Sequence, residues 1–402
     1  MMTGNARPSP FPISLCASHD PSLIGIFGTG RNGSTLLTRL LDGVSGAYVH
    51  PVEANFLSAM NDLYSHDYVS EGVIKNVVTH PLRHIDRSVP TGRLRRYYAY
   101  HRNEIETDLL PVVDSVELGP SPFDRLESRP AWAARDFVVE FLRAFADWLL
   151  PKAKPDLVIF KTIETPYIAD YERLFPNMRF IHIVRDPVEM WTSQKRSLVI
   201  GKNLPPWYLG MDNLSSCIDR RWIPHAKIIV ERMNSSAHFV LRYEDLVRDP
   251  NVAMSRLLEW MERRDPTLPM VQTVLGGRHP RRMQRYSSQP GVETSREVVA
   301  DLKARHGYVD VLSDRERDLV RLATWSLGRA LGYGLDTERP DPDAVRRLWK
   351  KIEREEFEYR GGIKFSILNA LSFLKRRLYV RHVCREARNR PAGMPPRGLS
   401  RR

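Results

Sequence analysis

Short apolar runs alternate with helix-like patterns along most of this chain. The clearest runs are Leu23–Phe27, Leu157–Lys161, Arg179–Val184 and His238–Arg242, and a shorter one covers Ala47–Val49. Runs of this length, bounded by turn residues, are typical of buried strands. Their alternation with helical segments predicts an α/β fold with a largely parallel central sheet that helices cover on both faces.

Helical segments show apolar positions that recur every three or four residues. Ser34–Leu41 and Phe137–Leu149 have this spacing, and Pro151 ends the second pattern. Residues 313–335 also have a helical pattern, whereas 60–156 contains few strand-like runs. We therefore expect a helical insertion at 60–156, between strands of the sheet.

The chain divides into three predicted parts. Residues 1–21, with several prolines, form a flexible leader; residues 22–338 form the body; residues 339–402 form a helical tail. Of the formal net charge of +13, residues 361–402 supply 11 Lys or Arg and one acid, Glu386, which gives 11 − 1 = +10. A basic tail on a near-neutral body predicts a surface anchor or an interaction arm and argues against a nucleic-acid-binding body.

The tail has the pattern of a basic amphipathic helix. Ile367, Leu371, Leu374 and Leu378 share one helical face, and lysines and arginines surround them. Such a helix can lie on an anionic membrane surface, or it can pack on the body or on a dimer partner with its charges in solvent. The sequence leaves these two alternatives open.

Cysteine usage and hydropathy exclude several protein classes. Cys16, Cys217 and Cys384 lie far apart, so the sequence predicts neither a disulfide framework nor a zinc site. No apolar run has the length of a membrane span, and the N-terminus is a poor signal peptide. These features predict a cytoplasmic protein, peripheral at the membrane if the tail binds there.

A glycine-rich loop, Gly28–Thr35, follows the first predicted strand and precedes the first helix. Glycines in this position let backbone N–H groups point at an anion, and the helix N-terminus adds its own donors. The loop departs from the nucleoside-triphosphatase pattern GxxxxGK[ST], because Ser34 stands where lysine is expected and the cation is Arg31. The sequence therefore predicts a phosphate site of another kind.

The segment GTGRNGSTLLTRLL resembles the 5′-phosphosulfate-binding loop of sulfotransferases that use 3′-phosphoadenosine 5′-phosphosulfate (PAPS). The similarity is greatest to the branch with an R-S-G-[ST]-[ST] core that acts on carbohydrates, with asparagine here where serine is usual. The resemblance implies that the donor is bound by Gly30, Arg31, Asn32, Gly33, Ser34 and Thr35. PAPS would be a co-substrate, and no metal is implied.

A second anion site is predicted at the end of the run RFIHIV. Arg185 follows this strand, and Ser193 comes eight residues later in the expected helix. An arginine at a strand end enters the crevice where open α/β sheets bind ligands, and a guanidinium can grip a phosphate. The segment is similar to the 3′-phosphate-binding motif of the same family. The alternative is a surface ion pair between Arg185 and Asp186 or another nearby acid.

Further segments agree with the resemblance. Phe160-Lys161-Thr162 is similar to the family's K-T-P segment, with Ile163 and Glu164 as two extra residues. Leu241–Leu246 is similar to [LV]-R-Y-E-D-L, whose tyrosine, here Tyr243, lies near the adenine or else belongs to the core. The candidates for the family's late donor-binding loop are Gly276-Gly277-Arg278 and Arg281-Arg282.

The segment HPVEANF resembles the family's P-P-E-[TS]-x-F, whose glutamate is the candidate base. Glu53 is therefore the first choice for the base and His50 the second. The alternative for Glu53 is an acid in a first helical turn. Arg31 is placed to neutralise the leaving phosphate, and Lys161 can assist it.

The resemblance implies transfer of a sulfonate group from PAPS to a hydroxyl of a carbohydrate, a glycolipid or a small alcohol. Two alternatives remain: a P-loop kinase of a nucleoside or small alcohol, and a non-catalytic anion- or membrane-binding relative. The missing loop lysine argues against the kinase. Residues 60–156 and 195–235 are expected to shape the acceptor pocket. Candidates to face it are Tyr64, His66 and Trp207, and the alternative for each is a place at the surface or in the core.

Overall fold

The computed structural model describes residues 21–42, 44–60, 89–104, 119–152, 154–201, 211–263, 312–334, 337–347 and 367–389. A five-stranded sheet forms the centre, in the order β2-β5-β1-β6-β7. Its strands are β1 (Ser22–Phe27), β2 (Ala47–Glu53), β5 (Leu157–Thr162), β6 (Arg179–Val184) and β7 (His238–Arg242). All four pairings are parallel, which confirms the predicted α/β fold.

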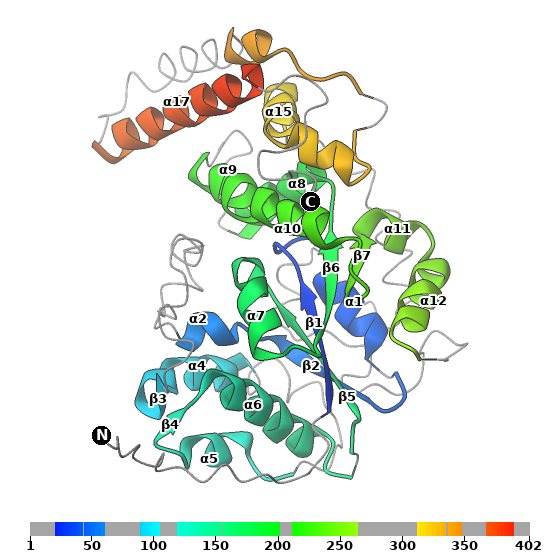
Figure 1. The fold of residues 1–402 in the computed structure, drawn as a ribbon. Helices are drawn as coiled ribbons and strands as arrows, with labels where there is room; N and C mark the ends of the chain where they lie inside the picture. The colour runs from blue at the N-terminus through cyan, green and yellow to red at the C-terminus, as the bar shows by residue number, and fades with distance from the viewer. Residues whose placement is uncertain are drawn as a thin grey trace, which may run out of the picture.

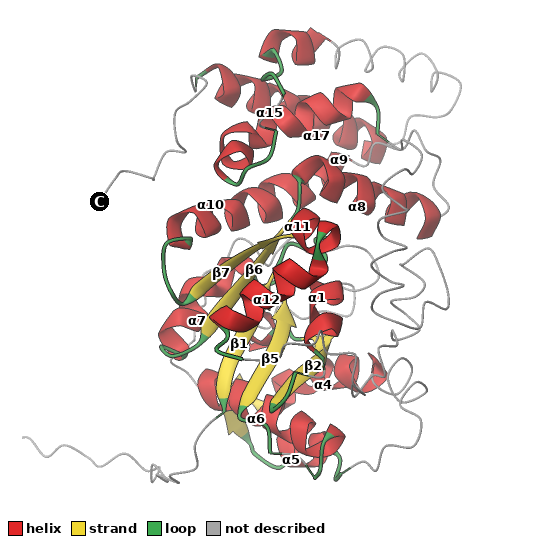
Figure 2. Ribbon diagram, turned by 90° about the vertical axis from the view of Figure 1, so that its right-hand side faces the viewer, coloured by secondary structure: helices red, strands yellow, loops and turns green. Residues whose placement is uncertain are grey.

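Alternate residues of each strand enter different cores, as expected for a sheet that is buried on both sides. In β1, Leu23 and Phe27 belong to one apolar cluster, and Ile24 and Ile26 to another. The first cluster includes residues of α2 (Phe56–Met60), α4 (Thr91–Glu104), α6 (Ala134–Leu149) and α7 (Ile168–Leu174). The second includes residues of α1 (Ser34–Leu41), α11 (Tyr243–Arg248) and α12 (Pro250–Trp260), and Figure 2, seen from the side of this second layer, shows α12 in front of the sheet.

The part of 60–156 that the structure describes is mainly helical. It contains α4, α5 (Pro122–Glu127) and α6, together with a two-stranded antiparallel pair that was not expected, β3 (Val89–Pro90) and β4 (Ala131–Trp132). The aromatic face of α6 packs on the segment after β2, where the rings of Phe56 and Phe141 lie 5.3 Å apart. This packing positions the end of β2 at the edge of the sheet.

A helical layer covers the end of the molecule that lies opposite α4, α5 and α6 (Figure 1). It comprises α8 (Pro187–Gly201), α9 (Met211–Cys217), the π-helical turn η4 (Ile218–Trp222), α10 (Ile223–Arg232), α15 (Asp314–Ala330) and α17 (Ile367–Arg388). A buried ion pair between Lys195 Nζ and Glu316 Oε2, 2.8 Å long, joins α8 to α15. Glu316 also completes a capping box with Ser313 at the start of α15.

The tail helix α17 packs on the body through a face that the sequence did not indicate. Among its described side chains, those of Val380, Val383, Cys384 and Ala387 are buried, in a cluster with residues of α9 and α15. The predicted apolar face is open where the structure describes it, because Leu374 is 53% and Leu378 54% exposed. None of the described helices has the length and apolarity that crossing a bilayer requires.

Candidate functional site

Several of the predicted site residues lie at the carboxyl edge of the sheet, where all five parallel strands end. The glycine loop follows β1, Arg185 follows β6, and Lys161 lies near the end of β5. In the neighbouring strand, Glu53 is in register with Lys161. Ligands of open α/β sheets bind in this crevice.

The loop after β1 turns sharply through left-handed backbone conformations. Gly30, Arg31 and Gly33 have φ angles of 75°, 56° and 94°. Asn32 holds this conformation, because its buried Nδ2 donates to the carbonyl oxygen of Ile183 in β6 over 2.8 Å. Asn32 Oδ1 also accepts from the backbone N–H of Ser34. The side chain of Asn32, predicted to contact the donor, thus binds the loop to β6.

The start of α1 completes the loop as an anion site. Gly33 is the N-cap residue and provides no side chain to bind the first N–H groups, and no acid lies in the first turn. Thr35, in this first turn, accepts a hydrogen bond from Lys161 Nζ over 3.1 Å. A buried lysine therefore adds its charge to the partial positive charge of the helix end.

Arg185 and Ser193 both contact the loop. Arg185 Nη1 donates to the backbone oxygen of Arg31 over 3.3 Å, and Arg31 Nε donates to Ser193 Oγ over 3.3 Å. The alternative pairing of Arg185 with Asp186 is not what the structure shows, because Asp186 Oδ1 accepts from two backbone N–H groups at the start of α8. The alternative of an ion pair with another nearby acid is present in the structure, because Arg185 Nη2 lies 3.8 Å from Glu189 Oε2 in α8.

The ring of Tyr243 joins the two predicted anion sites. It is only 4% exposed, and the guanidinium carbon of Arg185 lies 4.4 Å from its centroid. On the other side, a Cβ added to Gly33 would come within 2.3 Å of the ring. Glycine is required there by both the left-handed φ and this close approach.

Positive charge dominates this region. Burial lowers the pKa of Arg31, and the charges of Arg185 and Arg196 lower it further. Cations that repel one another in a buried site favour an anionic ligand, because such a ligand offsets both the repulsion and the lost hydration.

Glu53 lies at the end of β2 with a half-buried side chain. Asn55 Nδ2 donates to Glu53 Oε1 over 3.1 Å. Asn55 Oδ1 in turn accepts from Thr162 Oγ1 over 2.9 Å and from the backbone N–H of Ile163. Asn55 therefore ties the carboxylate to the end of β5, a role that the motif HPVEANF did not reveal.

His50, the second candidate for the base, faces the aromatic core. Its side chain is fully buried, with Nδ1 2.9 Å from Tyr48 Oη and the ring 5.2 Å from that of Phe145. Burial, aided by the charge of Lys161, lowers the pKa of His50 to about 3. His50 therefore belongs to the packing between β2 and α6, a position that does not suit a base for the acceptor.

Glu164, one of the two extra residues of the K-T-P segment, is a buried carboxylate. It accepts hydrogen bonds from the backbone N–H groups of Leu57 and Ser58 and from Tyr171 Oη, the last over 2.6 Å. Burial raises the pKa of Glu164 to about 7. It stabilises the start of α2, just after the segment that carries Glu53.

Arg221, from η4, also lies at this edge and had no signal of its own in the sequence. Its Nη1 is 3.7 Å from the position that a Cβ of Gly30 would take. The sequence analysis assigned the whole range 195–235 to the acceptor pocket and did not single out Arg221 within it.

Several predicted residues lie outside the described part of the chain: Tyr64, His66, Trp207, Gly276, Gly277, Arg278, Arg281 and Arg282. Within the described part, no group of three or more His, Cys, Asp or Glu side chains is arranged to hold a metal ion.

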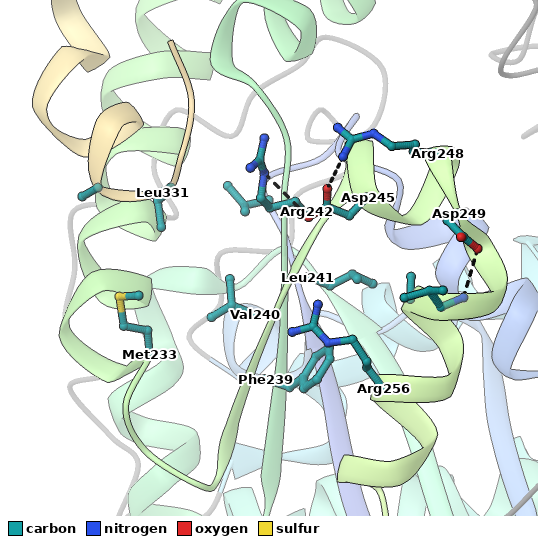
Figure 3. Close-up of a pocket in the computed structure, with 14 residues that line it drawn as sticks. Met233, Phe239, Val240, Leu241, Arg242, Asp245, Arg248, Asp249, Arg256 and Leu331 are labelled. Carbon is teal, nitrogen blue, oxygen red and sulfur yellow. Dashed lines mark hydrogen bonds and ion pairs between the residues drawn. The ribbon is translucent and has the colours of Figure 1, made fainter. Parts of the chain in front are cut away.

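A separate groove of about 460 Å³ lies beside the edge strand β7 (Figure 3). Phe239, Leu241, Val252 and Arg256 are among the residues that line it. None of its described lining residues is a predicted site residue, so the groove is distinct from the crevice at the strand ends.

The family model described as "Sulfotransferase family" matches residues 22–266, more than half of the chain. This chain belongs to the sulfotransferase family. The match covers all five strands and the glycine loop, and it ends before α15 and α17. Among curated protein sequences, none matches this sulfotransferase significantly.

Solved structures that resemble this sulfotransferase are distant in sequence. The sulfotransferase domain from the curacin biosynthetic pathway is 19% identical, with a TM-score of 0.44 over 79% of this chain and 100% of that one. The sulfotransferase domain from the Synechococcus PCC 7002 olefin synthase is 19% identical, with a TM-score of 0.45 over 79% and 98%. Retinol dehydratase in complex with androsterone and the inactive cofactor PAP is 14% identical, with a TM-score of 0.32 over 77% and 79%.

Proposed function

We propose that this sulfotransferase takes its sulfonate group from PAPS and transfers it to a hydroxyl of a carbohydrate, a glycolipid or a small alcohol. The observation that carries the proposal is the direct contact between the two predicted anion sites. Arg185 donates to the loop at Arg31, and Arg31 donates to Ser193. Two adjoining cationic sites fit a nucleotide that carries two separate phosphates.

The residues present suit such a donor. The first turn of α1, with Ser34 and Thr35, would hold the 5′-phosphosulfate, and Arg185 with Ser193 the 3′-phosphate. Tyr243 is buried against Arg185 and Gly33, between these two sites, which supports a place near the adenine. Bound there, PAPS would supply an activated sulfonate on a phosphate leaving group.

In the transfer, the acceptor oxygen attacks sulfur and forms the new O–S bond. The bond from sulfur to the phosphate oxygen breaks, and its electron pair stays on that oxygen as adenosine 3′,5′-bisphosphate leaves. Glu53 accepts the proton of the acceptor hydroxyl, and Arg31 and Lys161 offset the charge that develops on the leaving phosphate. Positioning and charge stabilisation are expected to supply most of the rate enhancement, by analogy with phosphoryl transfer.

Incubation with sulfur-labelled PAPS and a panel of glycans, lipids and alcohols tests this function. We expect labelled product without ATP and Mg²⁺, and competition by adenosine 3′,5′-bisphosphate. Phosphate transfer from ATP that needs Mg²⁺ would instead support a kinase. Binding of PAPS without transfer to any acceptor would support a non-catalytic relative.

We also propose that α17 contacts an anionic membrane surface. The supporting observation is that Leu374 and Leu378, both more than half exposed, lie beside the exposed Arg377 and Arg381. Exposed leucines next to arginines are the combination that binds an anionic lipid surface.

A further inference from the structure

The turn η4 interrupts the helical layer above the site with a wider, π-helical geometry. The backbone N–H of Ile223 bonds back to the carbonyl of Ile218, five residues earlier. Trp222, 1% exposed, donates from Nε1 to the backbone oxygen of Arg185 over 2.9 Å. Such turns are frequent at functional sites, and this one is tied directly to the end of β6.

On its outer side the same turn is held by Asp219. This carboxylate accepts from Ser215 Oγ over 3.0 Å and from Tyr379 Oη of α17 over 3.3 Å. With anchors on both sides, the turn keeps Arg221 in a fixed position over the carboxyl edge of the sheet.

Arg221 reaches from this turn to the first half of the glycine loop, at Gly30. Its Nε is buried and has no hydrogen-bond partner among the described residues. Burial lowers the pKa of Arg221, while the negative charge of Glu53 acts in the opposite direction and favours the charged guanidinium. A buried guanidinium donor left unpaired is costly, so an oxygen from a ligand would be stabilised there.

The other cations of the site contact protein residues that would hold the two phosphates of PAPS. Arg31 donates to Ser193, Arg185 to the loop, and Lys161 to Thr35 at the start of α1. Arg221 differs because it is near the beginning of the loop and within electrostatic reach of Glu53. In the proposed reaction, the group that passes between the loop and Glu53 is the sulfonate.

We propose that Arg221 is a further binding residue of this site and that its guanidinium contacts the sulfonate of the donor. The inference rests on the proposed function. The carboxylate of Glu53 by itself would repel the negatively charged sulfonate. A cation between the loop and Glu53 offsets that repulsion while leaving the carboxylate free to accept a proton.

The test compares two ligands, PAPS and adenosine 3′,5′-bisphosphate, which lacks the sulfonate. Calorimetric titration of the full chain needs no acceptor. We expect Arg221→Gln to weaken PAPS binding about ten- to a hundredfold, the usual effect of losing a charge-assisted hydrogen bond. Affinity for the bisphosphate should stay within about twofold of wild type, and Arg221→Lys should restore part of the PAPS affinity.

The matched control is Arg220→Gln, which removes an exposed guanidinium from the same turn. It should bind both ligands like wild type. The assignment of Arg221 would be overturned if Arg221→Gln weakened the binding of both ligands equally, or if it weakened the binding of neither. Wild-type protein that binds neither ligand would overturn the proposed function itself, so the two failures can be told apart.

Discussion

Glu53 combines partial exposure with a fixed orientation, which is what a general base needs. The hydrogen bond from Asn55 holds one carboxylate oxygen, and the pairing of β2 with β5 sets Glu53 opposite Lys161 of the neighbouring strand. The structure thus separates Glu53, at the crevice, from His50, which is buried three residues earlier.

Replacing Glu53 with Gln should lower turnover by about a hundred- to ten-thousandfold, because proton transfer by a positioned base contributes that much. Affinity for adenosine 3′,5′-bisphosphate should change less than twofold, since the proposed phosphate contacts remain. Labelled transfer and calorimetry measure the two effects. Glu262→Gln, at a carboxylate that is 84% exposed, is the control. Unchanged turnover in Glu53→Gln would exclude Glu53 as the base.

For single residues, the sequence indicated candidates for the site where all parts of a motif lie close together along the chain. Arg31, Arg185 and Ser193 could be selected because strand, turn and helix follow one another within each motif. The roles of Asn32 and Arg221 could not be predicted, because their contacts lie in β6 and at Gly30, far away along the chain.

Among the elements, α2 depends on a carboxylate from another part of the chain. Glu164 binds the first N–H groups of this short helix, and its burial makes the charged form costly. Burial raises the pKa of Glu164 from its ordinary value of 4.5, which applies in the unfolded chain, to about 7 in the folded protein. Its contribution to stability is therefore fully present below pH 4.5 and is lost as pH rises through 7.

We expect the unfolding free energy of wild type, relative to Glu164→Gln, to fall by about 2–3 kcal/mol between pH 5 and pH 8. Urea unfolding at several pH values measures this difference. Subtracting the variant removes the contribution of the buried histidines, whose lowered pKa values act in the opposite direction. A difference that does not change with pH would contradict a raised pKa at Glu164.

Elements with a single periodic pattern were predictable from the sequence. β6 and β7 have the predicted bounds, and α1 covers the predicted residues. β2 runs to Glu53 instead of Val49, and its register with β5 shifts around Pro51, which has no N–H to donate. The tail helix has two apolar stripes, and its sequence alone could not show that the body covers the second.

For the whole molecule, the packing of α17 determines how membrane binding can be tested. Deleting the tail would uncover apolar side chains of the body, because Val380, Val383, Cys384 and Ala387 belong to its core. Point substitutions at the exposed leucines avoid this.

The doubly substituted Leu374→Ser, Leu378→Ser chain should bind anionic vesicles at least about fivefold more weakly than wild type, because two apolar side chains no longer enter the lipid. Flotation with anionic and with neutral vesicles measures this. Val252→Ser, at an exposed position of α12, is the matched control. Equal binding of wild type and the double variant would show that this face does not contact membranes.

At the scale of the whole site, our central proposal is that the loop after β1 and Arg185 after β6 hold the two phosphates of one nucleotide. The most direct test is the affinity of wild type and Arg185→Ala for adenosine 3′,5′-bisphosphate and for adenosine 5′-monophosphate. Wild type should prefer the bisphosphate, and Arg185→Ala should lose about 1.5–3 kcal/mol for that ligand alone. Equal losses for both ligands, or no preference in wild type, would contradict the account.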